Sequence, residues 1–463
     1  MQVATVIKNA AIVTPTSVVK GELAIENGRI AAIGNLLNHG LTAVTTIDAK
    51  GQLVLPGMVD AHVHINEPGR SDWEDYQTGS QALAAGGTTS MVVMPLNALP
   101  ARTTAAEFNR HRQIASGKSY VDFALYGGLV PGNQAEIEAM AATGAAGFKA
   151  FMATAGTDTP GDFHNVDDYD LYWGMQATAK TGLRLSLHAE NAVLTDRLAE
   201  AEIAQGHTDI QAYIDSRPPM VEVEAVRRAL YIAKQTGCKL HFVHLSTGAA
   251  VREVQRARQA GQDVTCETCV HYLTLTTADF KRIGPLAKCA PVLRSPEIQA
   301  DLWHEVQAGH VDIVTSDHSP APAAMKADPH NNIFEVWGGI SGAQNNVDLF
   351  YDVGVKSGKL SVTQFVHLTA QRPAELFGLT QKGQLTVGKD ADFVLLDPNA
   401  SYTLRNEDLF YKNKLSAYVG RTIHSRVTRT LLRGQTIFEL GRPFSKEPTG
   451  KFLTNDLRTE ATL

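Results

Sequence analysis

The sequence predicts a (β/α)8 barrel joined to a small β-sandwich-like domain that is built from both ends of the chain. Between about residues 54 and 379, apolar strand-like runs alternate with amphipathic helical segments. Such alternation is typical of a parallel sheet with crossover helices, and the number of units favours closure into a barrel. A doubly wound open sheet is the alternative, but no G-x-G-x-x-G follows the first strand of this region.

The two ends of the chain share a sequence pattern that the middle lacks. TVIKNAAIVT and GELAIENGRIAAIG lie near the start, and GQLTVGKDADFVLLDP and SRVTRTLLRGQTIFELG lie near the end. Short β-rich runs separated by Gly and Asn-Gly are typical of hairpins. We therefore expect residues 1–53 and 380–440 to form one β-domain, 54–379 to form the barrel and 441–463 to form a tail.

Composition excludes several classes of partner. The 463 residues carry a net charge of −6, from 42 basic and 48 acidic side chains, which gives no electrostatic reason to expect nucleic acid or an anionic membrane. No apolar run approaches the roughly 20 residues that span a bilayer, and MQVATVIKNAAIV does not have the pattern of a signal peptide. Four cysteines are too few for a disulfide framework. We expect a cytoplasmic protein.

Polar side chains stand where the apolar runs of the barrel region stop. Active sites of such barrels lie at the C-terminal ends of the strands. The runs MVDAHVHI, AAGFKAFMA, LRLSLHAEN, CKLHFVHLS and VDIVTSDHS bring imidazoles, one lysine and one carboxylate to that rim. These residues are His62, His64, Lys149, His188, His244 and Asp317. Imidazole and carboxylate are ligands that suit zinc and its neighbours, so the pattern predicts a metal centre.

The spacing within the runs indicates which side chains share a face. His62 and His64 are two residues apart on a strand, so both side chains point the same way. His241 precedes His244 by three residues, and we expect only one of the two to look into the barrel. For Asp317 the structural alternative is a helix N-cap.

Lys149 is isolated in the apolar run GAAGFKAFMATAG. Desolvating an unpaired ammonium costs several kcal/mol, so one interpretation is that Lys149 ends its strand and reaches water. The other is that its neutral amine reacts with carbon dioxide to form a carbamate, an anionic group with two oxygens that can bridge two metal ions. Under that hypothesis Lys149 is an N6-carboxylysine.

The C-x-x-C motif of Cys266 and Cys269, with His271 nearby, has the spacing of half a zinc finger. No second pair follows at a suitable distance along the chain. Packing inside the barrel is therefore the favoured interpretation.

The motifs that hold these residues resemble the cyclic amidohydrolases of the amidohydrolase superfamily, and among them the allantoinases most closely. They extend over nearly the whole chain and include PGMVDAHVHINEPGR, AAGGTTSMVVMPLNALP, GFKAF, HAEN, SRPPMVEVEAVRR, VTCETCVHYL, LAKCAPVLR, SDHSP and WGGISG. The resemblance implies two divalent metal ions, with zinc expected and cobalt or manganese as alternatives. It implies one ion held by His62 and His64, the other by His188 and His244, and carboxylated Lys149 between them.

The resemblance also implies that Asp317 binds the first ion and carries the proton during catalysis. The implied reaction is hydrolytic opening of the hydantoin ring of allantoin to allantoate, a step in purine degradation. A hydantoinase or dihydropyrimidinase is the alternative, and a non-catalytic dihydropyrimidinase-like scaffold is a remote one. The family further implies a homotetramer.

Smaller features distinguish the branches. In the run KAFMAT, Thr154 stands where hydantoinases usually have a tyrosine. Asn66 stands where dihydroorotases usually have an arginine that binds a substrate carboxylate. We expect Asn97 and the backbone of Gly338 to contact the substrate. Ala290 replaces a serine that can contact the ring in relatives, and this removes one hydrogen bond.

Overall fold

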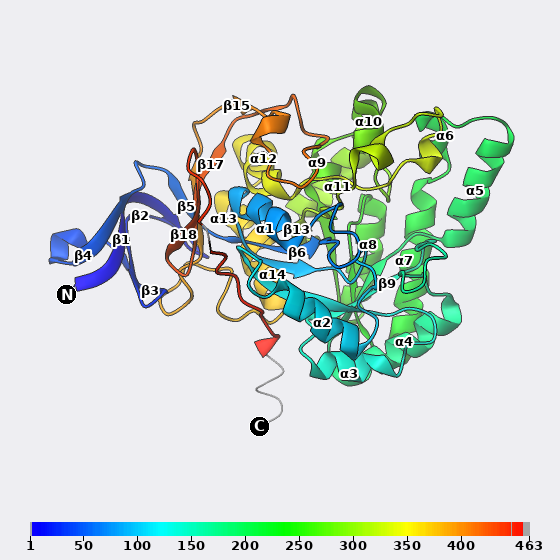
Figure 1. Ribbon diagram of the computed structural model, residues 1–463, viewed down its shortest axis with the longest axis horizontal. Coiled ribbons are helices and arrows are strands. Elements are labelled where there is room, and N and C mark those ends of the chain that lie inside the picture. Colours follow the sequence, from blue (N-terminus) through cyan, green and yellow to red (C-terminus); the bar gives the residue numbers. More distant parts are fainter. Residues whose placement is uncertain (1, 446, 457–463) are drawn as a thin grey trace.

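The computed structural model describes residues 2–445 and 447–456. Parallel strands form a nearly closed barrel in the order β13-β12-β11-β10-β9-β8-β7-β6 (Figure 1). They are β6 Met58–Val63, β7 Thr88–Val93, β8 Asp122–Gly128, β9 Gly147–Phe151, β10 Arg184–His188, β11 Lys239–Phe242, β12 Val264–Cys269 and β13 Ile313–Thr315. The sheet closes where Val63 forms a parallel bridge with His318, just after β13. The predicted barrel is confirmed.

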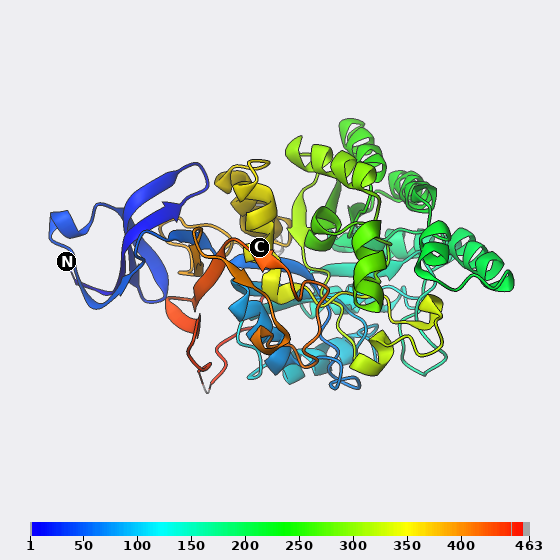
Figure 2. The same cartoon turned by 90° about the horizontal axis from the view of Figure 1, so that it is seen from above.

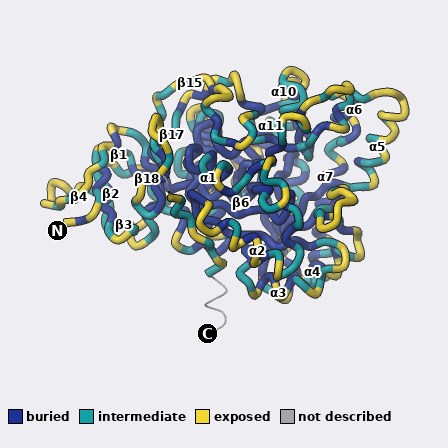
Figure 3. Tube along the Cα trace, viewed as in Figure 1, coloured by how far each residue is buried: buried dark blue, intermediate teal, exposed yellow. Residues whose placement is uncertain are grey.

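The barrel strands are buried on both faces. All residues of β6, β7 and β8 are buried, as expected for a parallel sheet that is filled inside and covered by helices outside. Buried segments concentrate at the centre of the barrel, and exposed segments lie at its periphery (Figure 3). This packing gives the strand ends fixed positions.

Helices surround the strands (Figure 2). Neighbours α2, α3, α4, α7, α8 and α11 contact one another in turn around the barrel. The helices are α1 Tyr76–Ala85, α2 Ala105–Ala115, α3 Glu136–Ala142, α4 Asp168–Thr181, α5 Ala192–Ala204, α6 Ile210–Asp215, α7 Pro219–Thr236, α8 Gly248–Gln259, α9 Val270–Thr274, α10 Thr277–Ile283, α11 Pro296–Gln307, α12 Asn346–Phe350, α13 Val362–Val366 and α14 Arg372–Leu376. Among the described residues, no helix has both the length and the apolar composition needed to cross a membrane.

Short helical turns complete the connections: η1 Leu37–His39, η2 Gly284–Ala287, η3 Ala323–Lys326, η4 Ile333–Glu335, η5 Ala343–Asn345, η6 Tyr351–Lys356, η7 His367–Gln371 and η8 Asn406–Asp408. Helix ends follow familiar sequence signals. The side chain of Thr247 accepts a hydrogen bond from the backbone of Ala250 and caps α8. Pro219 opens α7, and Gly237 ends it with a left-handed φ of 69°.

Strands from both ends of the chain form a second, mixed sheet beside the barrel (Figure 1). Its order is β18-β17-β14-β5-β1-β2-β3, with β4 paired to β1. The strands are β1 Gln2–Val13, β2 Val18–Glu26, β3 Arg29–Gly34, β4 Thr42–Asp48, β5 Leu53–Pro56, β14 Phe393–Asp397, β17 Arg426–Leu432 and β18 Gln435–Glu439, while β15 Tyr402–Thr403 pairs separately with β16 Thr422–Ile423. The expected contribution of both ends is confirmed. The domain division at 53, 379 and 440 stays a prediction.

Part of the predicted tail packs against the barrel. The backbone N–H groups of Gly450 and Phe123 donate to the carbonyls of Ser119 and Lys451, respectively. The Phe452 ring lies 5.7 Å from that of Phe123, centroid to centroid. Residues 446 and 457–463 of the predicted tail lie outside the described residues.

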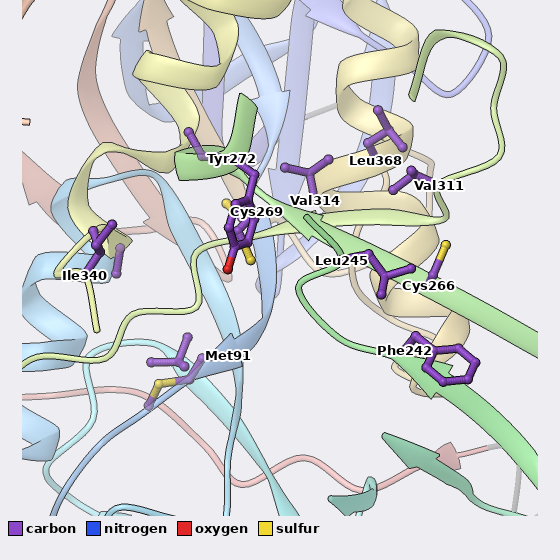
Figure 4. Packing of buried hydrophobic residues seen from close by; sticks show 14 of the residues in the cluster. Met91, Phe242, Leu245, Cys266, Cys269, Tyr272, Val311, Val314, Ile340 and Leu368 are labelled. Atoms are coloured by element: carbon purple, nitrogen blue, oxygen red, sulfur yellow. The ribbon is translucent and has the colours of Figure 1, made fainter. Parts of the chain in front are cut away.

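Cys266 and Cys269 belong to the main hydrophobic cluster (Figure 4). Both are fully buried, with Val314, Val311 and Leu368 in the same cluster. The interpretation of the C-x-x-C motif as barrel packing is confirmed.

Candidate metal centre and active site

The seam of the barrel, where β6 meets the segment after β13, brings three predicted ligands together. His62 and His64 come from the end of β6, and Asp317 follows β13. Asp317 Oδ1 lies 3.2 Å from His62 Nε2 and 3.3 Å from His64 Nε2. Burial raises the pKa of Asp317, but the adjacent imidazoles outweigh this effect and hold it below its usual value. One carboxylate oxygen of Asp317 therefore faces a ring nitrogen from each of the two histidines.

The second predicted pair lies directly beside the first. His188 ends β10 and His244 follows β11, with ring centroids 4.6 Å apart. The ring of His244 is also 5.3 Å from that of His62. Burial lowers the pKa of His64, His188 and His244, and neutral imidazoles are the form that binds metals. His244 Nδ1 is buried without a hydrogen-bond partner among the described residues.

Lys149, on β9, is fully buried, so the interpretation that it reaches water is wrong. Its Nζ has no hydrogen-bond partner among the described residues and lies 4.2 Å from the centroid of the Phe151 ring. Burial lowers the pKa of Lys149 to about 7. Burial therefore favours the neutral amine, the form that carbamate formation requires.

One expectation about β11 is wrong, because His241 and His244 face the same buried polar cluster. His241 Nε2 lies 3.1 Å from Glu267 Oε2, and Nδ1 lies 2.9 Å from Thr265 Oγ1. β11 ends at Phe242, and His244 then takes a left-handed φ of 42°. The alternation of side chains therefore stops before His244, and an offset of three no longer separates the two faces.

Two buried glutamates that the sequence reasoning missed hold these histidines. Glu190 Oε2 lies 2.9 Å from His188 Nε2, and Glu267 Oε1 lies 2.5 Å from His62 Nδ1. Burial raises the pKa of Glu267, but His62 and His241 outweigh it and lower the pKa to about 2. The available signals were a glutamate two residues after His188 and a charged residue inside the buried strand VTCETC.

A second group of potential ligands shares Asp317. Single ligand atoms of Cys269, His271 and Asp317 lie within 4.8 Å of one another, as do those of His62, His64 and Asp317. Burial raises the pKa of the Cys269 thiol well above its usual value. Because the thiolate is the metal-binding form, the group of two histidines and Asp317 suits a divalent ion better.

A cavity of about 510 Å³ opens over the histidines. Asn97, Ala290 and Gly338 line it together with the four histidines and Asp317, whereas Lys149 lies beneath its surface. A Cβ added to Gly338 would meet one atom within 4 Å, the hydroxyl of Tyr213 at 3.9 Å. The predicted substrate contacts and all the predicted metal ligands except Lys149 therefore lie on one cavity.

Charged side chains occupy the cavity wall. Arg70 donates to Asp162, with Nη2 2.9 Å from Oδ2, and to the carbonyl of Asn97 at 2.8 Å. Arg217 stacks over the Tyr213 ring at 4.2 Å, and its Nε has no partner among the described residues. The wall thus offers hydrogen-bond donors to a polar ligand.

This combination of a barrel and a histidine-rich strand-end site defines an amidohydrolase. The chain belongs to the Amidohydrolase family, whose model matches residues 53–437, and membership implies a binuclear metal centre. Its curated relatives include allantoinases. That of Enterococcus faecalis is 45% identical over 460 residues, covering 98% of this chain and 100% of the relative. That of Escherichia coli is 45% identical over 449 residues, covering 97% and 98%.

Solved structures of two hydantoinases share the fold. The L-hydantoinase (dihydropyrimidinase) from Arthrobacter aurescens has a TM-score of 0.93 and 34% identity, covering 98% of this chain and 100% of the other. The D-hydantoinase (dihydropyrimidinase) from Thermus sp. has a TM-score of 0.89 and 28% identity, covering 97% and 98%. The resemblance drawn from the sequence motifs is confirmed.

Proposed function

We propose that this chain acts as an allantoinase, a hydrolase that opens the hydantoin ring of allantoin to give allantoate. The observation that carries the proposal is the convergence of two histidine pairs and one carboxylate on a single cavity wall, above a buried lysine. The 45% identity to curated allantoinases over nearly the whole chain supports the choice of substrate.

The side chains present fit two divalent ions, with zinc expected and cobalt or manganese also suited to the ligands. His62 and His64 with Asp317 would hold one ion, and His188 with His244 the other. The unpartnered Nδ1 of buried His244 and the 3.2–3.3 Å spacings around Asp317 support this assignment. When bound, such ions supply positive charge that polarises an amide carbonyl and favours the ionisation of water.

Carboxylated Lys149 would bridge the two ions. Its neutral amine adds to carbon dioxide, a nitrogen–carbon bond forms, and the released proton passes to solvent. The product replaces the buried amine by an anion with two oxygens. Supporting this, Lys149 Nζ has no described hydrogen-bond partner and burial lowers its pKa to about 7.

Asp317 is the group that we propose moves the proton. Its carboxylate accepts a proton from the attacking water, and the oxygen of that water bonds to the ring carbonyl carbon. Asp317 then gives the proton to the ring nitrogen as the carbon–nitrogen bond breaks, acting as base and then as acid. Its position at the cavity, beside His62 and His64, supports both roles.

Features of the cavity favour allantoin over an unsubstituted hydantoin. Allantoin adds to the ring a ureido group, which has one carbonyl acceptor and several N–H donors. Arg217 Nε and Glu190 Oε1 are a buried donor and a buried acceptor without described partners, and both residues line the cavity. Asn97 and the backbone of Gly338 would contact the ring. Because the side chain of Ala290 cannot form a hydrogen bond, main-chain groups would hold the ring there.

A hydantoinase or dihydropyrimidinase is the second candidate, favoured by the TM-score of 0.93 to L-hydantoinase. A non-catalytic scaffold fits less well, because the full set of ligand side chains is present. From the family resemblance we also propose a homotetramer. The four cysteines, all buried and free, support the proposed cytoplasmic location.

Hydrolysis assays on the purified protein test the proposal. Allantoin, hydantoin, dihydrouracil and dihydroorotate are compared, with the metal content of the same sample measured in parallel. Turnover of allantoin above the others, with about two ions per chain, is the expected result. Preference for another ring would overturn the substrate, and absence of both metal and turnover after reconstitution with divalent ions and bicarbonate would overturn the function.

A further inference from the structure

A buried glutamate inside the barrel contacts both histidine pairs. Glu267, on β12, is fully buried. Its Oε1 lies 2.5 Å from His62 Nδ1 and 3.3 Å from the backbone nitrogen of His244. Its Oε2 lies 3.1 Å from His241 Nε2, and His241 in turn reaches Thr265. One carboxylate therefore links the two groups of proposed ligands.

These contacts determine where the proton of His62 resides. An ionised carboxylate only accepts hydrogen bonds, so Nδ1 of His62 and Nε2 of His241 must be the donors. An imidazole that binds a metal ion is neutral and carries one proton, so a proton held on Nδ1 by Glu267 leaves the Nε2 lone pair for the ion. That atom faces Asp317 Oδ1 at 3.2 Å. Glu267 thus presents the nitrogen of His62 that a metal ion would use.

The same contact crosses the place where the barrel closes. β6 and β13 end the strand order, and they meet through a bridge between Val63 and His318. Glu267 reaches from β12 to a side chain at the end of β6, past β13. Through its contact with the backbone of His244, it also ties β6 to the segment after β11.

We propose that Glu267 is a positioning residue of the metal centre, which fixes the protonated nitrogen of His62 and the spacing between His62 and His244. His241 holds the carboxylate of Glu267 from the opposite side. The proposal rests on the proposed metal ligation by these two residues. Hydrogen bonds to metal-binding histidines typically change metal affinity by about 10- to 100-fold.

Glu267→Gln is the direct test. The amide has one acceptor oxygen and one donor nitrogen, so it cannot accept hydrogen bonds from both His62 Nδ1 and His241 Nε2. Glu305→Gln is a matched control, because Glu305 is also buried and bonds to a histidine, with Oε2 2.6 Å from His310 Nδ1, but on α11 outside the barrel. Zinc-loaded proteins are titrated with a chromophoric chelator, and their unfolding temperatures are measured.

The expected result is zinc binding weakened about 10- to 100-fold by Glu267→Gln and unchanged by Glu305→Gln. Glu267→Asp keeps the charge but withdraws the carboxylate from His62, so it should also weaken zinc binding. This variant provides the test if the glutamine variant fails to fold. Zinc affinity within threefold of wild type in the folded variants, or equal weakening in Glu305→Gln, would overturn the inference alone. A wild-type protein that holds no zinc would overturn the proposed metal centre as well.

Discussion

Asp317 Oδ1 lies 3.2 Å from His62 Nε2, across the seam where the barrel closes. The same oxygen lies 3.3 Å from His64 Nε2. This arrangement places the proposed proton carrier against the first ligand pair. Asp317 also lines the cavity, so its replacement should change catalysis more than folding.

Asp317→Asn should leave the fold intact and reduce turnover of allantoin by at least about 10²- to 10⁴-fold, the usual contribution of general acid–base catalysis. The amide keeps the shape of the side chain but cannot accept and return a proton. Circular dichroism and steady-state kinetics check the two parts. Activity close to that of wild type would contradict the role of Asp317.

Lys149→Ala should lose bound metal, because the bridging carbamate cannot form. Short-chain carboxylates such as acetate or propionate, added at high concentration with zinc, should restore part of the activity by supplying the missing oxygens. Metal analysis and kinetics with and without the carboxylate measure this. Retention of both ions in Lys149→Ala would show that the lysine is not a ligand.

Arg217→Gln should lower kcat/KM for allantoin by about 10- to 100-fold, because it removes a charged donor from the cavity wall. The inhibition constant of hydantoin, which lacks the ureido group, should change several-fold less. Arg197→Gln, at an exposed position on α5, is the control. Equal effects on both ligands would show that Arg217 does not distinguish the ureido group.

Cys269→Ala should leave the metal content at wild-type stoichiometry. Cys269, His271 and Asp317 form the competing ligand group, but the raised pKa of the buried thiol disfavours the thiolate. Elemental analysis of the purified variant provides the measurement. Loss of one ion per chain would instead assign Cys269 as a ligand.

Asp348 should give stability a pH dependence of its own. Burial raises its pKa from 3.8 to about 7, and the side chain is 3% exposed beside Tyr402. Between about pH 4 and pH 7 the folded state therefore binds a proton that the unfolded state releases, so the free energy of unfolding falls as pH rises. Stability from this group is present below pH 4 and lost above pH 7.

Asp348→Asn should remove this slope, because the neutral amide resembles the protonated carboxyl. The variant should exceed wild type in unfolding free energy at pH 8 by on the order of a few kcal/mol, with the gap closing toward pH 4. Urea titrations across this range measure it, with exposed Glu200→Gln as the control. A pH-independent difference would contradict the assignment.

Local sequence pattern predicted the barrel and its rim because strand ends are set by short-range signals. Apolar runs fix the strands, and the residue after each run reaches the rim, as for His188 and Asp317. The convergence of the two histidine pairs follows from the parallel topology. The position of each strand and the residue at its end can therefore be predicted from the sequence of that strand alone.

The features of the site that the sequence did not predict depend on contacts between strands. His244 leaves the alternation because its φ is 42°, a backbone state that its own sequence does not specify. Glu267 contacts His62, 205 residues away in the chain. Neither the tautomer of His62 nor the inward position of His241 follows from spacing along one strand, since a partner on another strand determines each of them.

The mixed sheet has a consequence for how the chain is made. Pro56, at the end of β5, pairs with Phe393 at the start of β14. A ribosome that adds about 5–20 residues per second needs tens of seconds to produce that partner. During this interval the amino-terminal strands expose an unpaired edge. A growing chain therefore depends on its own C-terminal strands, or on a chaperone, to keep that edge from another nascent chain.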